Sequence, residues 1–162
     1  MKRDIFIDNN IASKFANPAD PEYKELIRWL MDNHDIPEGQ DDDRAYLVVS
    51  QKLMTEYNRS CRDASGSTSI PMIISKLTQE GRLVRISNQQ IKDFKSLHFR
   101  KAVEKKLRSN NEDREHIPTV LLSDRKYALT YDEDFTYDLE HFPGFTVIVK
   151  SRPEEIPYKS AP

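Results

Sequence analysis

The chain begins with MKRDIFIDNN (residues 1–10), in which three apolar β-formers, Ile5, Phe6 and Ile7, stand between Asp4 and Asp8. A run that is apolar on both faces predicts a buried strand, which is typical of a parallel sheet covered by helices. Asp8 then places a carboxylate at the carboxyl end of that strand. Because ligands of open parallel sheets gather at this edge, these residues indicate both a class of fold and the place of its site.

The rest of the chain alternates strand patterns with helix patterns. Further strands are predicted at 46–49, 82–86, 127–130 and 145–149, and the segment 82–86 alternates as an exposed or edge strand would. Helices are predicted at 21–33, 51–62, 71–80, 92–108 and around Pro118. The alternation predicts an α/β fold of three layers, α/β/α, around a central, mainly parallel sheet of about five strands.

Length and composition narrow the class of protein further. A chain of 162 residues fits one domain, which we place at 1–157 with a tail at 158–162. Cys61 is the only cysteine, which excludes an internal disulfide and a multi-cysteine zinc site. A dinucleotide fingerprint or phosphate-binding P-loop in its usual form is excluded because the glycines lie far apart, at Gly39, Gly66, Gly81 and Gly144.

The charge balance argues against binding by bulk charge. The chain has 25 Lys and Arg residues against 27 Asp and Glu residues, a formal net charge of −2. A polybasic nucleic-acid binder is therefore not indicated, although a local basic patch stays open. No apolar run approaches the roughly 20 residues of a membrane-spanning helix, and Asp4 and Asp8 interrupt what would be the core of a signal peptide. We expect a cytoplasmic protein without a membrane partner.

Acidic side chains recur where the predicted strands end. Asp8 follows the first strand, Glu56 lies in the helix after the second, Asp113 precedes the helix before the fourth, and the fourth strand runs into Asp132 and Asp134. Carboxylates that share a cleft repel one another, and a hard divalent cation such as Mg²⁺ or Mn²⁺ relieves that repulsion. Helix caps, turns and ordinary solvated acids are the alternative interpretation of the same residues.

Four segments together make the chain resemble a PIN domain. They are Phe6-Ile7-Asp8-Asn9-Asn10, Leu53-Met54-Thr55-Glu56-Tyr57, Asp113 three residues before His116, and Leu129-Thr130-Tyr131-Asp132-Glu133-Asp134-Phe135. Their order and spacing match over about residues 3–157. PIN domains are metal-dependent nucleases, mostly acting on RNA, and include the toxins of many toxin–antitoxin modules.

The resemblance implies roles for individual residues. Asp8, Glu56, Asp113 and Asp132 would be catalytic metal ligands for Mg²⁺ or Mn²⁺, with Asp134 as a supporting acid. Asn9 and Thr130 would hydrogen-bond the ligands. The implied partners are an RNA substrate, a small antitoxin protein and a second copy of the chain.

Pro118 departs from the family pattern and leaves two alternatives open. This proline stands early in the helix after Asp113, so Glu112 or Glu115 could replace Asp113 in the site. It also motivates an alternative function, a PIN-like module that binds RNA or a protein without cutting.

Basic side chains near the acids are candidates for phosphate contacts. On a helix over 92–108, Lys101, Lys105 and Arg108 form one stripe, opposite Phe99, Val103 and Leu107. The complete set of nucleic-acid-binding candidates is Lys14, Arg59, Arg62, Lys101, Lys105 and Arg108. A solvated helix face is the alternative interpretation of the stripe. We interpret His116 as a surface histidine.

Overall fold

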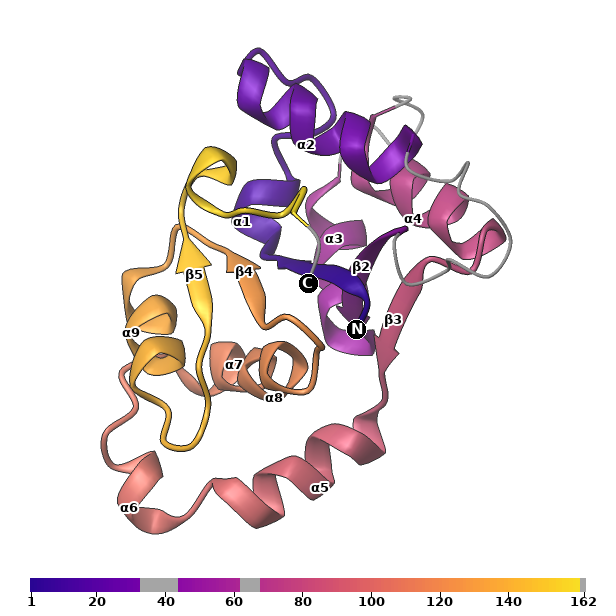
Figure 1. Ribbon diagram of the computed structural model, residues 1–162. Coiled ribbons are helices and arrows are strands. Elements are labelled where there is room, and N and C mark those ends of the chain that lie inside the picture. The colour runs from indigo at the N-terminus through magenta and orange to yellow at the C-terminus, as the bar shows by residue number, and fades with distance from the viewer. Residues whose placement is uncertain (33–43, 62–67, 161–162) are drawn as a thin grey trace.

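The computed structural model describes residues 1–32, 44–61 and 68–160. These residues contain a five-stranded sheet in the order β3-β2-β1-β4-β5, with every neighbouring pair parallel (Figure 1). The strands are β1 (Arg3–Ile7), β2 (Ala45–Ser50), β3 (Leu83–Ile86), β4 (Tyr127–Leu129) and β5 (Ile148–Lys150). The predicted α/β class, the parallel sheet and the edge position of 82–86 are confirmed.

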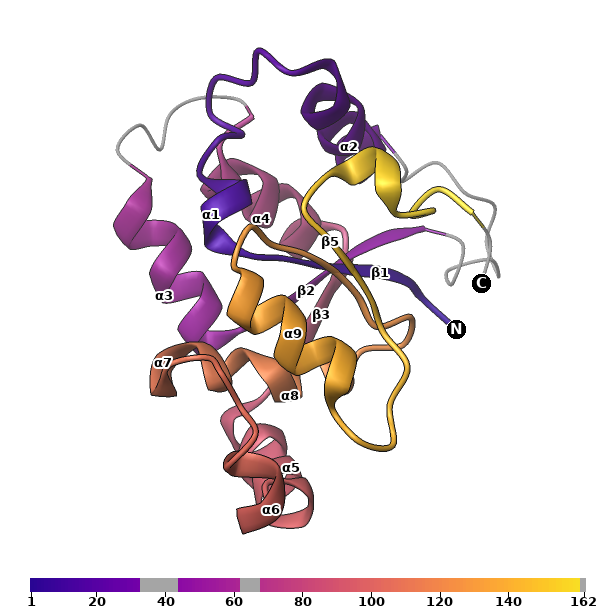
Figure 2. The same ribbon diagram turned by 90° about the vertical axis from the view of Figure 1, so that its left-hand side faces the viewer.

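Helices cover both faces of this sheet and complete the three layers of a PIN-like fold. The helices are α1 (Asn9–Ala12), α2 (Pro21–Asp32), α3 (Gln51–Ser60), α4 (Ile70–Gln79), α5 (Asn88–His98), α6 (Lys101–Glu104), α7 (Asn111–Arg114), α8 (His116–Leu121) and α9 (Glu133–His141). The chain steps outward from β1 to β3 through α1–α4 and returns through α5–α8 to β4. Because parallel crossovers are right-handed, these two groups lie on opposite faces, and Figure 2 shows α8 and α9 below the sheet with α1 and α4 above it.

The middle of the sheet is the apolar core of the protein. Ile5, Phe6 and Ile7 of β1 are fully buried, as are Leu47 and Val48 of β2. Each such side chain contributes roughly 1.5–3 kcal/mol by leaving water. The strands that carry the first predicted acids are thus the most deeply buried in the fold.

Polar side chains cap the starts of α3 and α2. The Ser50 hydroxyl accepts a hydrogen bond from the Leu53 amide at 3.1 Å, which begins α3 directly after β2. The Asp20 carboxylate accepts one from the Glu22 amide at 2.9 Å and begins α2. These bonds satisfy amides that the first turn of a helix leaves unpaired.

The prediction of one helix over 92–108 is wrong. Helix α5 begins earlier, at Asn88, where Ser87 and Gln90 form a capping box, and it ends at His98. Phe99 follows with a non-helical backbone and contacts Phe142, whose ring centroid lies 5.6 Å away, while Phe94 contacts Phe142 at 5.9 Å. In a continuous helix, residues 94 and 99 would point about 140° apart. Ending the helix allows both rings to reach one aromatic cluster.

The same cluster shortens the last predicted strand. Residues 145–147 lie outside β5, which begins at Ile148. Phe145 contacts Phe94 at 5.5 Å and Phe142 at 5.9 Å between ring centroids. The Phe145 ring thus packs between α5 and the segment after α9, and the edge strand β5 is shorter than predicted.

A buried carboxylate joins the start of β1 to the turn before β4. Asp4 is fully buried and accepts hydrogen bonds from the amides of Asp124 at 2.8 Å and Arg125 at 2.9 Å. The Arg125 guanidinium donates to the carbonyl oxygens of Tyr158 and Ser160 at 3.0 and 3.1 Å. Tyr158, assigned to the tail by sequence, is buried and packs its ring 5.0 Å from that of Trp29.

We expect Asp4→Ala to destabilise the fold. The substitution leaves the Asp124 amide and the buried Arg125 amide without an acceptor, and an orphaned buried donor costs roughly 1–3 kcal/mol. The free energy of unfolding in urea should fall by about 2 kcal/mol or more. Asp93→Ala, at an exposed position of α5, is the control and should change it by less than about 0.5 kcal/mol. Equal losses in both variants would contradict the role given to Asp4.

Candidate active site

Strand register brings the first and last predicted acids to one edge of the sheet. Ile7 of β1 pairs with Leu129 of β4, and the Asp8 amide donates to the Leu129 carbonyl at 2.9 Å. Asp8 therefore lies beside Thr130, the residue after β4. Helices α1, α3 and α9 follow β1, β2 and β4. Figure 2 shows these helices, together with α7, on the side of the molecule to which β1 leads.

Thr130 connects Asp8 with Asp132. Its hydroxyl donates to Asp8 Oδ2 at 2.6 Å and accepts from the Asp132 amide at 3.1 Å. The other Asp8 oxygen, Oδ1, accepts from the Asn9 amide at 2.8 Å. Burial raises the pKa of Asp8, and the Thr130 and Asn9 hydrogen bonds, with the His116 ring, oppose that rise. Thr130 thus forms hydrogen bonds with both predicted ligands, and its role in supporting a metal site stays a prediction.

Asp113 and Asp132 face each other across the site. The pKa of Asp113 is raised from 3.8 to about 6. Burial is the largest cause, and the charge of Asp132, a hydrogen bond between the two carboxyl groups and the charge of Asp8 raise the pKa further, in that order. A carboxylate surrounded in this way retains a proton that it would lose in water. Asp132 also caps α9, because its Oδ1 accepts from the Phe135 amide at 3.0 Å. The cap interpretation and the site interpretation of Asp132 thus hold together.

Glu56 enters the cluster from α3 and is held by a buried histidine. His116 Nε2 lies 2.9 and 3.0 Å from the two carboxylate oxygens of Glu56. Since an ionised carboxylate only accepts, we assign the proton to Nε2. The His116 side chain is 2% exposed, against 25% for Glu56. Its Nδ1 is buried without a hydrogen-bond partner among the described residues.

The interpretation of His116 as a surface histidine is therefore wrong. The ring packs against both Phe6 and Phe135, whose centroids lie 5.8 and 6.4 Å away. Its position three residues after Asp113 was the sequence signal for a role in the site. Burial, which decides that role, depends on how α8 packs and is not visible in the local sequence.

A core hydrogen bond sets the position of α3. The Tyr57 hydroxyl is fully buried and donates to the Ile7 carbonyl, one residue before Asp8. The pKa of Tyr57 is raised well above its ordinary value, mainly by burial and to a smaller extent by the negative charges of Asp8 and Glu56. Tyr57 and Glu56 are adjacent in sequence, so this bond places the Glu56 backbone beside the end of β1.

The remaining predicted acids are separate from this cluster. Asp134 is exposed on the first turn of α9, and among the described residues no hydrogen bond or ion pair joins it to the other acids. Glu112 is exposed, and Glu115 forms an ion pair with Lys95. Asp113 is the acid of this segment that interacts with Asp132 and Asp8, so Pro118 does not displace it. The Asn9 amide nitrogen Nδ2 donates to Ser60 Oγ at 2.6 Å, away from Asp8.

The donor chemistry fits a hard divalent cation, but the arrangement is not a ready-made coordination site. Four carboxylates, Asp8, Glu56, Asp113 and Asp132, interact electrostatically, and burial together with the neighbouring carboxylates raises the pKa of Asp113 to about 6. Within 1–32, 44–61 and 68–160, however, no three His, Cys, Asp or Glu side chains are placed to hold one ion together. The Asp113–Asp132 and Glu56–His116 contacts would have to open for shared coordination.

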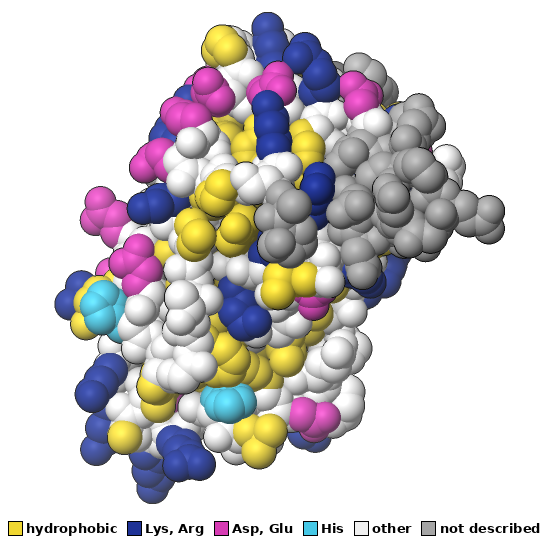
Figure 3. All heavy atoms as spheres, in the orientation of Figure 1, with side chains coloured by type: hydrophobic (Ala, Val, Ile, Leu, Met, Phe, Trp, Pro, Cys, Tyr) yellow, Lys and Arg dark blue, Asp and Glu magenta, His cyan; other side chains and the backbone are white. Residues whose placement is uncertain are grey.

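The predicted basic stripe does not exist as one helix face. Lys101 and Lys105 lie on and just after α6, and Arg108 follows the end of that helix. Figure 3 shows Lys and Arg side chains gathered at the lower left of the molecule, over α6. The Arg108 guanidinium lies 3.4 Å from the centroid of the Tyr137 ring, and its amide donates to Asp138.

The other basic candidates lie near α1 and α3. Lys14 places its ammonium 5.6 Å from the ring centroid of Tyr131, which is 40% exposed beside Asp132. Arg59 is exposed in the last turn of α3. Arg62 lies outside the described residues.

These features define a PIN-like fold: a parallel α/β/α sheet, here with carboxylates of four segments at its carboxyl edge. A chain of the crystal structure of VapBC2 from Rickettsia felis, bound to a DNA fragment from their promoter, has a similar fold. The similarity covers 92% of this chain and 98% of that one, with a TM-score of 0.53 and 16% sequence identity. No protein-family model and no curated protein matches the sequence.

The similarity supports the fold over nearly the whole length of both chains. At 16% identity it concerns the architecture alone. In the described ranges, no helix has the length and apolar character needed to cross a membrane.

The raised pKa of Asp113 predicts how stability changes with pH. Between its ordinary value of 3.8 and the folded value of about 6, the unfolded carboxyl is ionised while the folded one keeps its proton. The folded state then binds more protons, so this group makes stability fall as pH rises through that window. Asp113→Asn removes the charge. In EDTA the variant should melt above the wild type at about pH 8 and close to it at about pH 4.

The matched control is Glu112→Gln, one residue away and exposed. It should leave the melting temperature unchanged at both pH values. An Asp113→Asn protein that melts below the wild type at about pH 8 would contradict the crowding of carboxylates in this site.

Proposed function

We propose that this protein is a metal-dependent endoribonuclease that hydrolyses RNA phosphodiester bonds, and that it is the toxin of a toxin–antitoxin module. The observation that carries the proposal is the convergence of Asp8, Glu56, Asp113 and Asp132 from four separate segments. A fold stabilised only by its core has no need to gather like charges in one place. The PIN-like architecture supports the same class of activity.

The four converging acids would hold one or two Mg²⁺ or Mn²⁺ ions, with Asp134 as the supporting acid. Such ions, when bound, lower the pKa of a coordinated water and neutralise charge on a phosphoryl group. Products with a 5′-phosphate and a 3′-hydroxyl are implied by the resemblance to PIN domains. No protein nucleophile is required.

Other side chains of the site would orient these acids. Thr130 fixes Asp8 Oδ2 by a hydrogen bond of 2.6 Å and so selects the direction in which that oxygen can bind. His116 holds both oxygens of Glu56, and Tyr57 fixes the helix that carries Glu56. Groups that orient ligands in this way typically change activity or metal affinity 10- to 100-fold when removed.

The toxin role rests on the similar fold in a VapBC2 complex. It includes a small antitoxin protein as partner and a cytoplasmic location. Growth arrest on expression, relieved by co-expression of the antitoxin, is the expected behaviour. A homodimer stays a prediction, which light scattering would test.

A second candidate is a PIN-like module that binds RNA or a protein without cutting. The observation that favours it is the pairing of Glu56 with His116, which occupies both oxygens of one proposed ligand. A module that never binds a metal could keep this pair permanently. Calorimetric titration with Mn²⁺ separates the two functions, because the nuclease binds the ion and this module does not.

An RNA cleavage assay with Mg²⁺, Mn²⁺ or EDTA tests the proposed nuclease. We expect cleavage with either ion and none in EDTA. Asp8→Asn should lower the cleavage rate by about 100-fold or more, because it removes a charged ligand with little change in volume. Asp93→Asn makes the same chemical change on the exposed part of α5 and should cleave normally. Full activity of Asp8→Asn in Mn²⁺, or cleavage that persists in EDTA, would refute the mechanism.

A further inference from the structure

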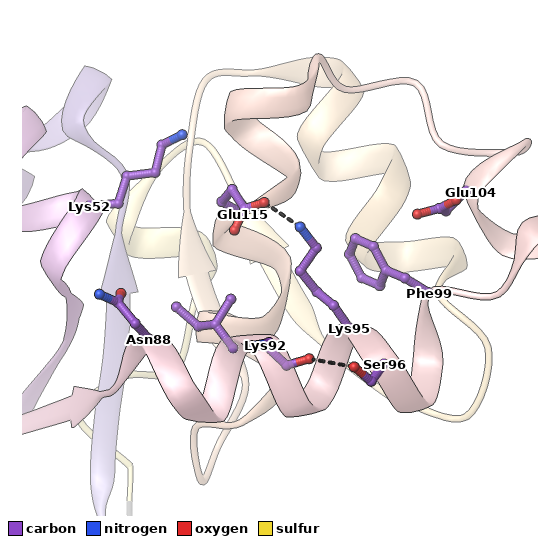
Figure 4. Close-up of a pocket in the computed structure, with 9 residues that line it drawn as sticks. Lys52, Asn88, Lys92, Lys95, Ser96, Phe99, Glu104 and Glu115 are labelled. Atoms are coloured by element: carbon purple, nitrogen blue, oxygen red, sulfur yellow. Dashed lines mark hydrogen bonds and ion pairs between the residues drawn. The ribbon is translucent and has the colours of Figure 1, made fainter.

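A pocket lined by charged, polar and apolar side chains lies next to the acid cluster, between α3 and α5. Its volume is about 530 Å³, and Figure 4 shows the side chains that line it. Three lysines take part, Lys52 from α3 and Lys92 and Lys95 from α5. None of these lysines was a predicted nucleic-acid contact.

The wall formed by α5 carries four polar side chains at helical spacing, together with Ile91. Asn88, Lys92, Lys95 and Ser96 lie at i, i+4, i+7 and i+8, which is one face of a helix. Phe94 faces the opposite way and is buried among other rings. The three lysines thus line the pocket together with Ile91, Phe99 and two acids, and among the described residues Lys52 and Lys92 form no ion pair.

Two parts of the chain contribute both to the pocket and to the acid cluster: helix α3 and the adjacent residues Glu115 and His116. Lys52 and Glu56 are four residues apart on α3, so they lie on the same face, about 6 Å apart along the helix axis. Glu115 lines the pocket and pairs with Lys95, as the dashed line in Figure 4 shows, while the next residue, His116, holds Glu56. A chain of phosphates could therefore pass from one to the other along α3.

The charges of the two regions are complementary in function. A cluster of carboxylates repels a polyanion, so an RNA strand that reaches it needs positive charge close by. Lysine ammonium groups supply that charge without reading sequence. Glu104 lines the end of the pocket away from α3 in Figure 4, which confines the positive end to the side of Lys52.

We propose that the pocket between α3 and α5 is a phosphate-binding subsite for the RNA strand, in which Lys52 and Lys92 contact a backbone phosphate beside the one that is cleaved. The inference rests on the proposed ribonuclease function. In the protein without RNA, Glu115 occupies Lys95, and arrival of a phosphate would release that lysine as a third contact.

Fluorescence anisotropy with a labelled single-stranded RNA in EDTA measures this subsite without cleavage. We expect the double variant Lys52→Ala/Lys92→Ala to bind about tenfold more weakly at low salt than the wild type. The slope of log K against log salt should become shallower by about 0.7, because the double variant loses the contact with one phosphate and each neutralised phosphate of a single strand contributes about 0.7. Glu115→Gln should act in the opposite direction, with tighter binding and a steeper slope, because it frees Lys95.

The charge-matched control is Lys24→Ala/Arg28→Ala on α2, at the end of the molecule away from α5 (Figure 1). It should keep wild-type affinity and slope. Equal losses in both double variants would overturn the proposal, and so would unchanged binding by Lys52→Ala/Lys92→Ala. If the wild type still cleaves RNA in those cases, the subsite fails and the ribonuclease stands. A wild type that neither binds nor cleaves RNA refutes both.

Discussion

The parallel pairing of β1 with both β2 and β4 is the constraint on which the other features of this protein depend. It places β1 at the centre of the sheet, where helices on both faces require an apolar strand, and it directs three strand ends to one edge. Asp8 reaches that edge because Ile7 pairs with Leu129. Core and site are therefore built by the same backbone hydrogen bonds.

Carboxylates gathered at that edge repel one another, and three interactions in the structure reduce this repulsion. Thr130 donates to Asp8, His116 donates to Glu56, and the raised pKa of Asp113, about 6, lets this carboxyl keep its proton beside Asp132 at mildly acid pH. Each of these contacts stabilises the cluster in the absence of a cation. Two of them also keep oxygens away from shared coordination, so ion binding and these contacts compete for the same atoms.

The fold was predictable because its signals are local. An apolar run such as Ile5-Phe6-Ile7 identifies a buried strand wherever it occurs, and Ser50 marks a helix start by itself. Features that depend on distant partners were missed. Helix α5 ends at His98 because the ring of the next residue, Phe99, packs on Phe142, which is distant in sequence. His116 is buried because α8 packs against Phe6 and Phe135. In the site, residue types indicated which acids to consider, while three-dimensional packing separated Asp113 from Glu112 and Glu115.

The bond from the Tyr57 hydroxyl to the Ile7 carbonyl has a consequence for large mutational surveys of this protein. A substitution of Tyr57 alters no acidic group, yet it frees α3 to shift, and Glu56 moves with that helix. A survey scored on phenotype alone would therefore rank a tyrosine of the interior among the reactive groups. Scoring abundance in parallel separates the two, because a shifted helix in an intact sheet lowers the phenotype more than the amount of folded protein.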